Sequence, residues 1–507
     1  MALTKVSYSM ITGATVNVLD YGAVGDGVAN DQPAIQAAIN AANTQGGGIV
    51  YFPVGTYLIL TPLVGKSLVY LIGEVKGAFS TASESPPNVF IGGVQIKAGA
   101  AMAAMYSFVG TSASDTANIA IENIYFECSA LATGGISIRK AVDVSLFRVQ
   151  VHTATTAPFI LGTAADTSTP MFFLYLDQCY ANGTGGAATL FSICATQVHM
   201  TRCLSDNGAI AVALVGGSGD VLIDNCRFEG YSVKGIAIQD FGISYTIRGT
   251  TCVATPSSAA GVIGIEIDES QGFAEVSGCT IYGGSFASSI GINVLDSGAG
   301  IFANISNNYV IQCATALSYN ASYGGAVIGN IFEALTSGTA VLLQNSTSKL
   351  SFIGNICRGI TGATSVTALN NQSTNKTILF DNNQTSGTTT GIYFPTTTYG
   401  NVAIDSGQIQ VSDYSGMATV ATSATGILQA NAGGSSCLVV VSGSSGSNRF
   451  TDLVAFFNGG IVVISSSTMS GAPAARTYTD GGGGLLLLAM ASGSYSVSIF
   501  VLENFRT

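Results

Sequence analysis

The stretch NVLDYGAVGDGVANDQPAIQAAINAA, residues 17–42, contains a loop signal followed by a helix signal. Three glycines in its first half favour turns, because glycine adopts positive φ angles that other residues resist. Asp31 stands two residues before Pro33, a spacing that favours a helix N-terminus. An apolar stripe at helical spacing then follows, made of Ala34, Ile35, Ala38, Ile39 and Ala42. The stretch therefore predicts a turn-rich loop and a short amphipathic helix capped by Asp31.

The residues after this helix predict β-structure. Three consecutive glycines at 46–48 end the helix. The segment GIVYFPVGTYLI at 48–59 is rich in β-branched and aromatic residues and is interrupted at 53–55 by Pro-Val-Gly. We therefore expect two short strands directly after the helix.

This order of loop, helix, glycines and strands resembles the opening of pectate-lyase-like proteins, in particular phage tailspikes and capsule depolymerases. The resemblance implies an all-β chain built as a right-handed parallel β-helix, whose end is plugged by the short helix. On this basis residues 17–60 are expected to form the capping helix and the start of the β-helix.

The composition and charge of the chain disfavour several classes of partner. Only 9% of the 507 residues are charged and 63 are glycine, so Ser, Thr, Asn and Gly must form much of the surface, as in repeated tight turns. The net charge of −11 argues against nucleic-acid and anionic-membrane partners. The longest apolar run, at 485–491, is far shorter than the roughly 18 residues of a membrane span. The opening MALTKVSYSM has no secretory signal core, so we expect folding in a reducing cytoplasm.

Strand-like segments ending in Asn, Asp or Gly recur between residues 118 and 395. Aligning them gives one column with steps of 23 to 30 residues, the length of one coil of a parallel β-helix. The aligned residues are Ile124, Val149, Cys179, Cys203, Cys226, Cys252, Cys279, Asn308, Ile331, Ile356 and Asn383. The mainly small and apolar character of this column predicts that it points inward.

The five cysteines of this column are expected to be buried free thiols, because free cysteine packs as a small hydrophobe. No histidine or close cysteine pair completes a metal site, and we expect neither a metal nor another cofactor. Asn308 and Asn383 fit an internal asparagine ladder, in which side-chain amides bond along the stack.

A second column lies three residues further along each coil, at a turn before strands that often read Gly-Ile-x-Ile. Its members are Glu127, His152, Asn182, Asp206, Glu229, Thr255 and Tyr282. In the related polygalacturonases the catalytic aspartates occupy this turn. Here only Asp206 matches, because Ser232, Val233 and Lys234 stand in place of the acids one coil later. The acidic cluster and arginine of calcium-dependent pectate lyases are also missing from the sequence, so a pectin-degrading enzyme is disfavoured.

Asp206 and Glu229 fall on adjacent coils, which would place their carboxyl groups about 5 Å apart, as in a retaining glycosidase. Like charges at that distance raise one pKa and leave one group as a proton donor. We therefore assign these two residues to catalysis, with His152 as a sugar ligand or proton relay. Asn182, Tyr231 and Tyr282 complete the expected substrate contacts on this side. The alternative is that acids and amides simply favour turns.

A third column offers a rival catalytic site. It contains Asp240, Glu269 and Asp296, with Glu266 and Asp268 beside it as expected substrate contacts. Stacked acids repel one another unless they bind something or face water, so a solvated turn ladder is the competing interpretation. The chain has no Trp, and sugar platforms would have to come from tyrosines. The tyrosines considered are Tyr231, Tyr245, Tyr282, Tyr309, Tyr319 and Tyr323.

The coil repeat stops after Pro395, and alternating strands with tight turns follow. We expect residues 61–395 to form the β-helix and residues 396–507 a C-terminal β-sandwich. This part resembles the small C-terminal domains of phage depolymerases, which implies that it trimerises or binds glycan. Asn458-Gly459 between two apolar runs predicts a hairpin. Residues 1–16 are expected to be an N-terminal attachment segment.

Together these features predict a homotrimeric phage tailspike that binds and depolymerises a bacterial surface polysaccharide, most simply by glycoside hydrolysis rather than by a lyase reaction. Its expected partners are that polysaccharide and other phage tail or baseplate proteins, and its expected location is the virion tail at the host surface. The main alternative is a receptor-binding spike of the same fold without enzymatic activity.

Overall fold

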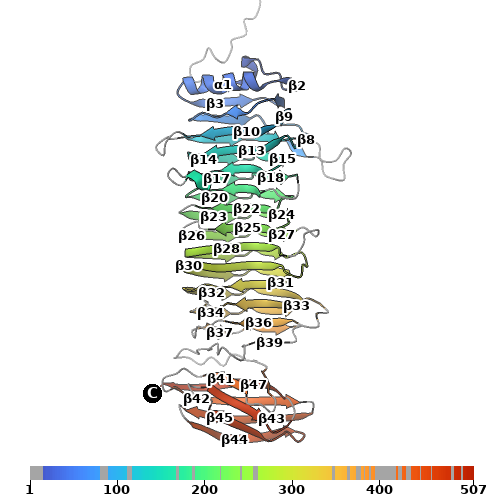
Figure 1. Cartoon of the computed structure of the whole chain (residues 1–507), viewed down its shortest axis with the longest axis vertical. Coiled ribbons are helices and arrows are strands. Elements are labelled where there is room, and N and C mark those ends of the chain that lie inside the picture. Colours follow the sequence, from blue (N-terminus) through green and yellow to red (C-terminus); the bar gives the residue numbers. More distant parts are fainter. Residues whose placement is uncertain are drawn as a thin grey trace, which may run out of the picture. The chain divides into compact units, whose positions relative to one another are not determined.

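The structure is a computed structural model of the whole chain (Figure 1). The residues that it describes are 15–79, 90–110, 117–166, 171–184, 189–216, 219–239, 243–254, 261–344, 347, 349–361, 363, 366–372, 378–381, 383–386, 390–393, 418–420, 425–429, 435–445, 447–457, 460–480, 485–492 and 495–506. By its internal contacts the chain divides into two compact units, one of residues 1–284 with 297–299 and one of residues 285–296 with 300–507.

The predicted capping helix is α1 (Gln32–Thr44), and it buries the apolar stripe Ile35, Ala38, Ile39 and Ala42. Asp31 occupies the N-cap position, but its carboxylate does not cap the helix. It accepts hydrogen bonds from the backbone N–H groups of Val24 (2.6 Å) and Gly25 (3.2 Å) instead. The expected capping role is therefore wrong: Asp31 fastens the glycine-rich loop to the start of the helix. Within the described part of the chain, no helix has both the length and the apolar character needed to cross a membrane.

Unit 1 is a parallel β-helix, as predicted. Its strands form three sheets, named here A, B and C. Sheet A contains β1 (Val16–Asn17), β3 (Gly48–Phe52), β6 (Val69–Gly73), β11 (Ile119–Glu122), β14 (Val142–Phe147), β17 (Phe172–Asp177), β20 (Val198–Thr201), β23 (Asp220–Asp224) and β26 (Ser244–Arg248). Sheet B contains β2 (Asp26–Asn30), β4 (Gly55–Ile59), β9 (Val94–Ala98), β12 (Ile124–Glu127), β15 (Gln150–Ala154), β18 (Tyr180–Gly183), β21 (Leu204–Asp206), β24 (Arg227–Tyr231), β27 (Thr251–Ala254) and β29 (Thr280–Tyr282). Sheet C contains β5 (Leu63–Val64), β10 (Met102–Val109), β13 (Ala132–Arg139), β16 (Ala157–Leu161), β19 (Thr189–Ile193), β22 (Ile210–Val215) and β25 (Lys234–Gln239).

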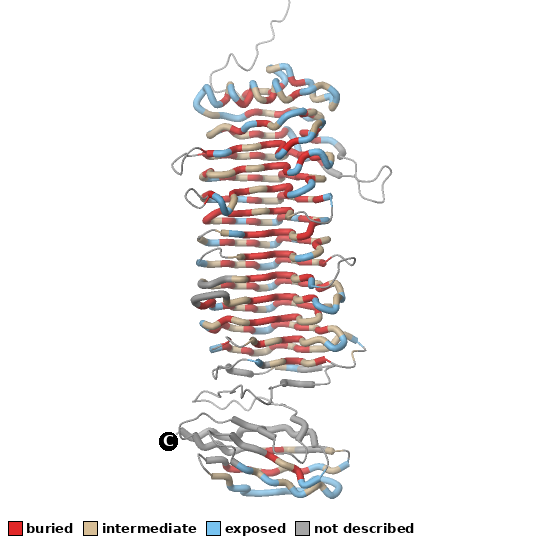
Figure 2. Tube along the Cα trace, in the orientation of Figure 1, coloured by how far each residue is buried: buried red, intermediate tan, exposed pale blue. Residues whose placement is uncertain are grey.

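The last long strand of unit 1, β28 (Ile263–Ser277), serves two sheets. Its first part pairs with β25 in sheet C, and its second part pairs with β26 in sheet A. The unit also contains a small antiparallel ribbon of β7 (Ala78–Phe79) and β8 (Phe90–Ile91). Alternate residues of the strands point inward and are buried, which gives the continuous interior of Figure 2.

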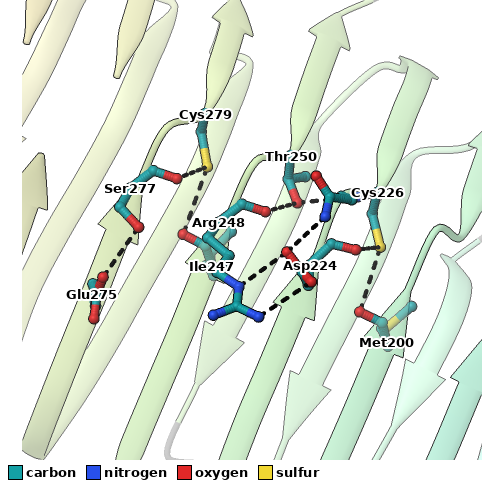
Figure 3. A network of polar contacts seen from close by, with 10 residues as sticks. Met200, Asp224, Cys226, Ile247, Arg248, Thr250, Glu275, Ser277 and Cys279 are labelled. Carbon is teal, nitrogen blue, oxygen red and sulfur yellow. Dashed lines mark hydrogen bonds and ion pairs between the residues drawn. The ribbon is translucent and has the colours of Figure 1, made fainter. Parts of the chain in front are cut away.

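The turn from sheet A to sheet B carries the predicted inward column, with one error. Register places Cys203 opposite Cys226, because Leu204 pairs with Arg227. Arg227 pairs with Thr251 in the next coil, so Thr250 and not Cys252 follows Cys226 (Figure 3). Cys252 lies one strand position later, opposite Phe228. All five predicted cysteines are nevertheless buried and free.

Unit 2 begins with further coils of the same three-sheet pattern. Their strands are β30 (Ile290–Ser306), β31 (Tyr309–Tyr319), β32 (Gly324–Ile328), β33 (Ile331–Leu343), β34 (Leu350–Ile353), β35 (Ile356–Gly359), β36 (Thr367–Asn371), β37 (Ile378–Asp381), β38 (Gln384–Ser386) and β39 (Thr390–Tyr393). Adjacent coils pair in parallel, as β30 with β32 and β33 with β35.

The asparagine ladder of unit 2 is longer than predicted. Asn308 Nδ2 donates to Asn330 Oδ1 (3.0 Å), Asn330 Nδ2 to Asn355 Oδ1 (2.9 Å) and Asn355 Nδ2 to Asn383 Oδ1 (3.0 Å). The assignment of Ile331 and Ile356 to this column is therefore wrong by one residue. Apolar character pointed to the isoleucines, but an asparagine is accommodated inside because its amide is satisfied by the coils on either side.

The C-terminal part of unit 2 is antiparallel, as expected for a sandwich. Five strands pair in the order β40 (Ala418–Val420), β47 (Tyr495–Arg506), β42 (Ser435–Ser445), β43 (Asn448–Phe457) and β44 (Gly460–Ser470). Three more pair in the order β41 (Thr425–Gln429), β46 (Leu485–Met490) and β45 (Arg476–Asp480). Arg476 of β45 forms an ion pair with the fully buried Asp452 of β43, which ties the two sheets together. The hairpin residues 458 and 459 lie outside the described residues, but the strands that flank them pair as predicted.

Candidate functional site

The second predicted column lies on the outer side of sheet B. The register pairs Glu127 with His152, and Asn182 with Asp206. One coil after Glu229 the register position is taken by Val253, which pairs with Tyr282. Thr255, the residue predicted there, lies outside the described residues. The column therefore changes from polar to apolar after Glu229.

Asp206 and Glu229 are the two acids that this column brings together. Ser205 of β21 pairs with Phe228 of β24. Asp206 and Glu229, the next residues of these strands, therefore face each other on adjacent coils. A methyl group built on Gly230 would lie 2.3 Å from Asp206 Oδ1, which places the Asp206 carboxylate directly over the strand that carries Glu229. Neighbouring strands of a sheet lie about 4.8 Å apart, which gives the approximate distance between these two side chains.

The electrostatic environments of the two acids differ. Burial raises the pKa of Asp206, the backbone N–H of Asn207 opposes this, and the nearby negative charge of Glu229 adds to the rise. Glu229 is partly exposed and accepts a hydrogen bond from Arg227 Nε (2.7 Å). The arrangement thus offers one carboxyl group with a raised pKa and one carboxylate beside a guanidinium.

His152 lies between two tyrosine rings, with centroid distances of 4.8 Å to Tyr125 and 4.8 Å to Tyr180. Burial lowers the pKa of His152 to about 3, so its imidazole is neutral at physiological pH. This argues against the expected proton relay and leaves a packing or hydrogen-bonding role. Asn182 donates a hydrogen bond to the hydroxyl group of Tyr180 (3.4 Å). Burial raises the pKa of Tyr180, and the nearby negative charges of Asp206 and Glu229 raise it further.

Glu127, at the other end of the column, has a structural role. Its carboxylate accepts hydrogen bonds from the Tyr125 hydroxyl (2.5 Å), the Ser129 backbone N–H (2.7 Å) and the Thr153 hydroxyl. These contacts hold the turn after β12.

The rival acidic column lies only partly within the described residues, so it stays a prediction. Asp240 and the side chain of Glu269 lie outside the described residues, and Asp296 belongs to unit 2, where it accepts a hydrogen bond from the Ser322 backbone N–H (3.1 Å). Glu266 is buried on the outer side of sheet C and forms an ion pair with Lys234. Asp268 lies nearby in β28, opposite Gln239.

The Lys234–Glu266 pair explains a departure seen in the sequence. Lys234 stands where polygalacturonases carry an acid, and Glu266 of the next coil neutralises it. No group of three or more His, Cys, Asp or Glu side chains within the described ranges is placed to hold a metal ion.

The tyrosines proposed as sugar platforms are mostly inaccessible. Tyr231, Tyr245 and Tyr319 are fully buried, so their rings are not available for stacking on a sugar. Tyr282 and Tyr309 are half-buried, and Tyr323 is exposed.

An aromatic surface that sequence reasoning missed lies on sheet A instead. Phe173, Tyr175 and His199 are exposed there, and the Tyr175 and His199 rings lie 5.3 Å apart. The sequence signal for this surface is FFLYLD at 172–177, in which aromatic residues alternate with inward leucines. These residues lie on a strand and not in the turn columns, so the turn columns did not predict them.

Comparison with known proteins supports the family resemblance. Residues 15–237 match the family described as "Rhamnogalacturonase A/epimerase, pectate lyase-like". The match covers less than half of the chain and agrees with the resemblance noted in the sequence.

Two similar proteins share short segments with this chain, and one solved structure aligns with most of it. Mannuronan C5-epimerase AlgE1 of Azotobacter vinelandii is 47% identical over 68 residues, which are 12% of this chain and 5% of that protein. Plasmin and fibronectin-binding protein A of Streptococcus pneumoniae is 54% identical over 57 residues, 11% of this chain and 8% of that protein. The chain thus aligns with less than a tenth of the length of either relative. The solved Dettilon tailspike protein (gp208) aligns over 96% of this chain and 94% of that chain, with 12% identity and a TM-score of 0.48.

Proposed function

We propose that this chain, which is pectate-lyase-like over residues 15–237, is a phage tailspike that binds and hydrolyses a bacterial surface polysaccharide. The observation that carries the enzymatic part is the pairing of Asp206 and Glu229 on adjacent coils, with the pKa of Asp206 raised by burial and by the charge of Glu229. The parallel β-helix and the C-terminal antiparallel sheets support the spike assignment.

The two acids suit a retaining glycosidase. Protonated Asp206 donates its proton to the glycosidic oxygen as the bond to the anomeric carbon breaks, and the Glu229 carboxylate attacks that carbon. Asp206, now a carboxylate, then removes a proton from water, which displaces Glu229 and regenerates both groups. Arg227 forms an ion pair with the Glu229 carboxylate and holds it beside Asp206.

Neighbouring side chains supply orientation. The half-buried Tyr180 lies beside both acids, and Asn182 donates to its hydroxyl group. We assign Asn182, Tyr180 and the neutral His152 to substrate contacts rather than to proton transfer.

A second candidate is a receptor-binding spike without enzymatic activity. The ion pair between Arg227 and Glu229 favours it, because a carboxylate engaged by a guanidinium is a weaker nucleophile. In this case the same column binds the polysaccharide and leaves it intact.

The test measures oligosaccharide release from purified capsular and O-antigen polysaccharides of the host. Asp206→Asn and Glu229→Gln should each lower turnover at least about a hundredfold, because each removes a proton-transfer or nucleophilic group. Asp220→Asn, an exposed acid on sheet A, is the matched control and should retain the wild-type rate. Wild-type turnover in either site variant would exclude this pair.

Further assays address the activity and the site. No release by the wild-type protein, with retained glycan binding, would support the receptor-binding alternative. Inactivation by Asp296→Asn with an active Asp206→Asn variant would move the site to the third column.

Two measurements address the assembly and the location. Light scattering should give a trimer. Immunogold labelling of phage particles should place the protein at the tail, in contact with baseplate proteins.

A further inference from the structure

Sheet A carries a hollow that the carboxylate pair of sheet B does not use. Its volume is about 330 Å3, and it is lined by Asn118, Val142, Asp143, Phe173 and Tyr175. These residues belong to, or directly precede, β11, β14 and β17, which are neighbours in sheet A. The site is therefore built on three consecutive coils of unit 1.

The register places the Tyr175 wall of the hollow. Ala120, Ser145 and Tyr175 occupy the same outward position in consecutive coils. Tyr175 is the large side chain of this position, and its ring lines the hollow. His199 continues the column and packs its ring edge-on against Tyr175 at 5.3 Å.

The second wall is held in an uncommon backbone conformation. Asn118, Asp143 and Phe173 occupy equivalent places before or at the start of their strands, and their φ angles are 35°, 60° and 54°. Asparagine and aspartate tolerate positive φ, but a bulky aromatic residue rarely adopts it, and such strain gathers at functional sites. Phe173 nevertheless remains 42% exposed and Tyr175 41% exposed, so neither ring is placed there by burial in the core.

The chemistry of the lining fits an uncharged sugar. Aromatic faces pack against the apolar C–H face of a pyranose ring, while an amide and a carboxylate at the rim accept or donate hydrogen bonds to its hydroxyl groups. Among the described residues that line the hollow there is no Lys or Arg, and Asp143 would repel a uronic acid.

We propose that this hollow is a second saccharide-binding site, which takes one neutral hexose or N-acetylhexosamine ring against Phe173 and Tyr175. Its physiological meaning rests on the proposed function, since the ring would belong to the same polysaccharide that the sheet B column engages. Held on a different sheet of the same coils, such a site anchors the chain between cleavage events.

Saturation-transfer NMR on the full-length protein tests the site. The probes are the methyl glycosides of glucose, galactose and N-acetylglucosamine, with methyl glucuronide as the charged comparison. At least one neutral glycoside should receive saturation, and the glucuronide should bind more weakly. Phe173→Ala and Tyr175→Ala should each raise the Kd at least about threefold, as loss of an aromatic face predicts.

Matched variants keep the test specific. Tyr175→Phe retains the ring and should bind as the wild type does, and Tyr323→Ala, which removes an exposed aromatic residue of unit 2, should change nothing. Asp206→Asn should also bind normally, so loss of hydrolysis and loss of this site are separable. Absence of saturation for all three neutral probes, or an unchanged Kd in both alanine variants, would overturn the proposal. A changed oligomeric state of Phe173→Ala in sedimentation would overturn it in favour of a subunit interface.

Discussion

The turn between sheets A and B is lined with sulfur in unit 1 and with amides in unit 2. In unit 1 the Sγ atoms of Cys179, Cys203 and Cys226 contact carbonyl oxygens of the preceding coil, at 3.3 Å, 3.5 Å and 3.6 Å. In unit 2 the Nδ2 atoms of Asn330, Asn355 and Asn383 donate to the equivalent carbonyl oxygens at 2.8 Å, 2.7 Å and 2.8 Å. Both side chains therefore meet the same acceptor, three residues before the column in the preceding coil.

The difference lies in what the side chain accepts. Asn355 Oδ1 receives the backbone N–H of Asn330 (3.0 Å) as well as its Nδ2 group (2.9 Å). A thiol is a weak donor and a weak acceptor, and cannot replace this pair of bonds. Thr250, which interrupts the sulfur column, restores part of the amide pattern by accepting the Cys226 backbone N–H (3.4 Å; Figure 3). One turn geometry is thus stabilised by packing in one unit and by hydrogen bonds in the other.

Asn355→Ala should produce the largest effect. It leaves the buried Asn330 backbone N–H without its acceptor and breaks the ladder in the middle. We expect a loss of about 2–4 kcal/mol in the free energy of unfolding, because a stranded buried donor costs more than a lost bond. Urea unfolding followed by circular dichroism measures it. A loss as small as that of a surface substitution would show that the ladder is not what stabilises these coils.

Alkaline pH should have the next largest effect, and it acts on the cysteine column rather than on the asparagine ladder. Burial raises the pKa of the Cys279 thiol to about 11, from an ordinary value near 9. Its stabilising contribution is complete below about pH 9 and is lost as the pH rises to about 11, because the unfolded thiol ionises first. Over that window the loss is about 2–3 kcal/mol.

Urea midpoints measured from about pH 8 to pH 10.5 check this dependence. The decline should be shallower in Cys279→Ala, while Asn355→Ala should keep the wild-type slope, since an amide does not titrate. Equal slopes in the wild type and Cys279→Ala would contradict the buried, protonated state of this thiol.

Cys203→Ala should cost less than Asn355→Ala. It removes one sulfur atom and a weak contact with the Leu176 carbonyl oxygen, and leaves a small cavity between Cys179 and Cys226. We expect about 1–2 kcal/mol, as for the loss of a small buried group. The two alanine variants should be compared in the same unfolding experiment, and a cost equal to that of Asn355→Ala would remove the distinction between the columns.

Thr250→Cys should have the smallest effect. It makes the sulfur column continuous but removes the hydroxyl group that accepts from Cys226 and donates to the Arg248 carbonyl oxygen (3.1 Å). The lost hydrogen bonds are long, and sulfur packs well beside sulfur, so we expect less than about 1 kcal/mol. Thermal unfolding is the measurement, and a loss above that of Cys203→Ala would mean that the hydroxyl group is essential to this coil.

The candidate site was only partly accessible from the sequence. The column position of Asp206 and Glu229 followed from coil length alone, because parallel coils repeat the same position at each step. The neutral state of His152 did not, since it depends on burial between Tyr125 and Tyr180. The hollow beside Phe173 is lined by residues of three coils, and only strand pairing supplies their alignment.

The sequence by itself determined the β-helix through its family resemblance and its coil-length repeat. It determined the capping helix and the antiparallel C-terminal strands because an apolar stripe, turn residues and strand alternation are local signals. Tertiary structure decided the register within each coil. A shift of two residues, as between Thr250 and Cys252, keeps the same face of the strand inward, so the hydropathy pattern does not detect it. The hydropathy pattern also did not detect that Asn330, rather than Ile331, occupies the inward column, for a related reason. An inward asparagine is acceptable only when the next coil supplies its partner, and that partner is 25 residues away in the chain.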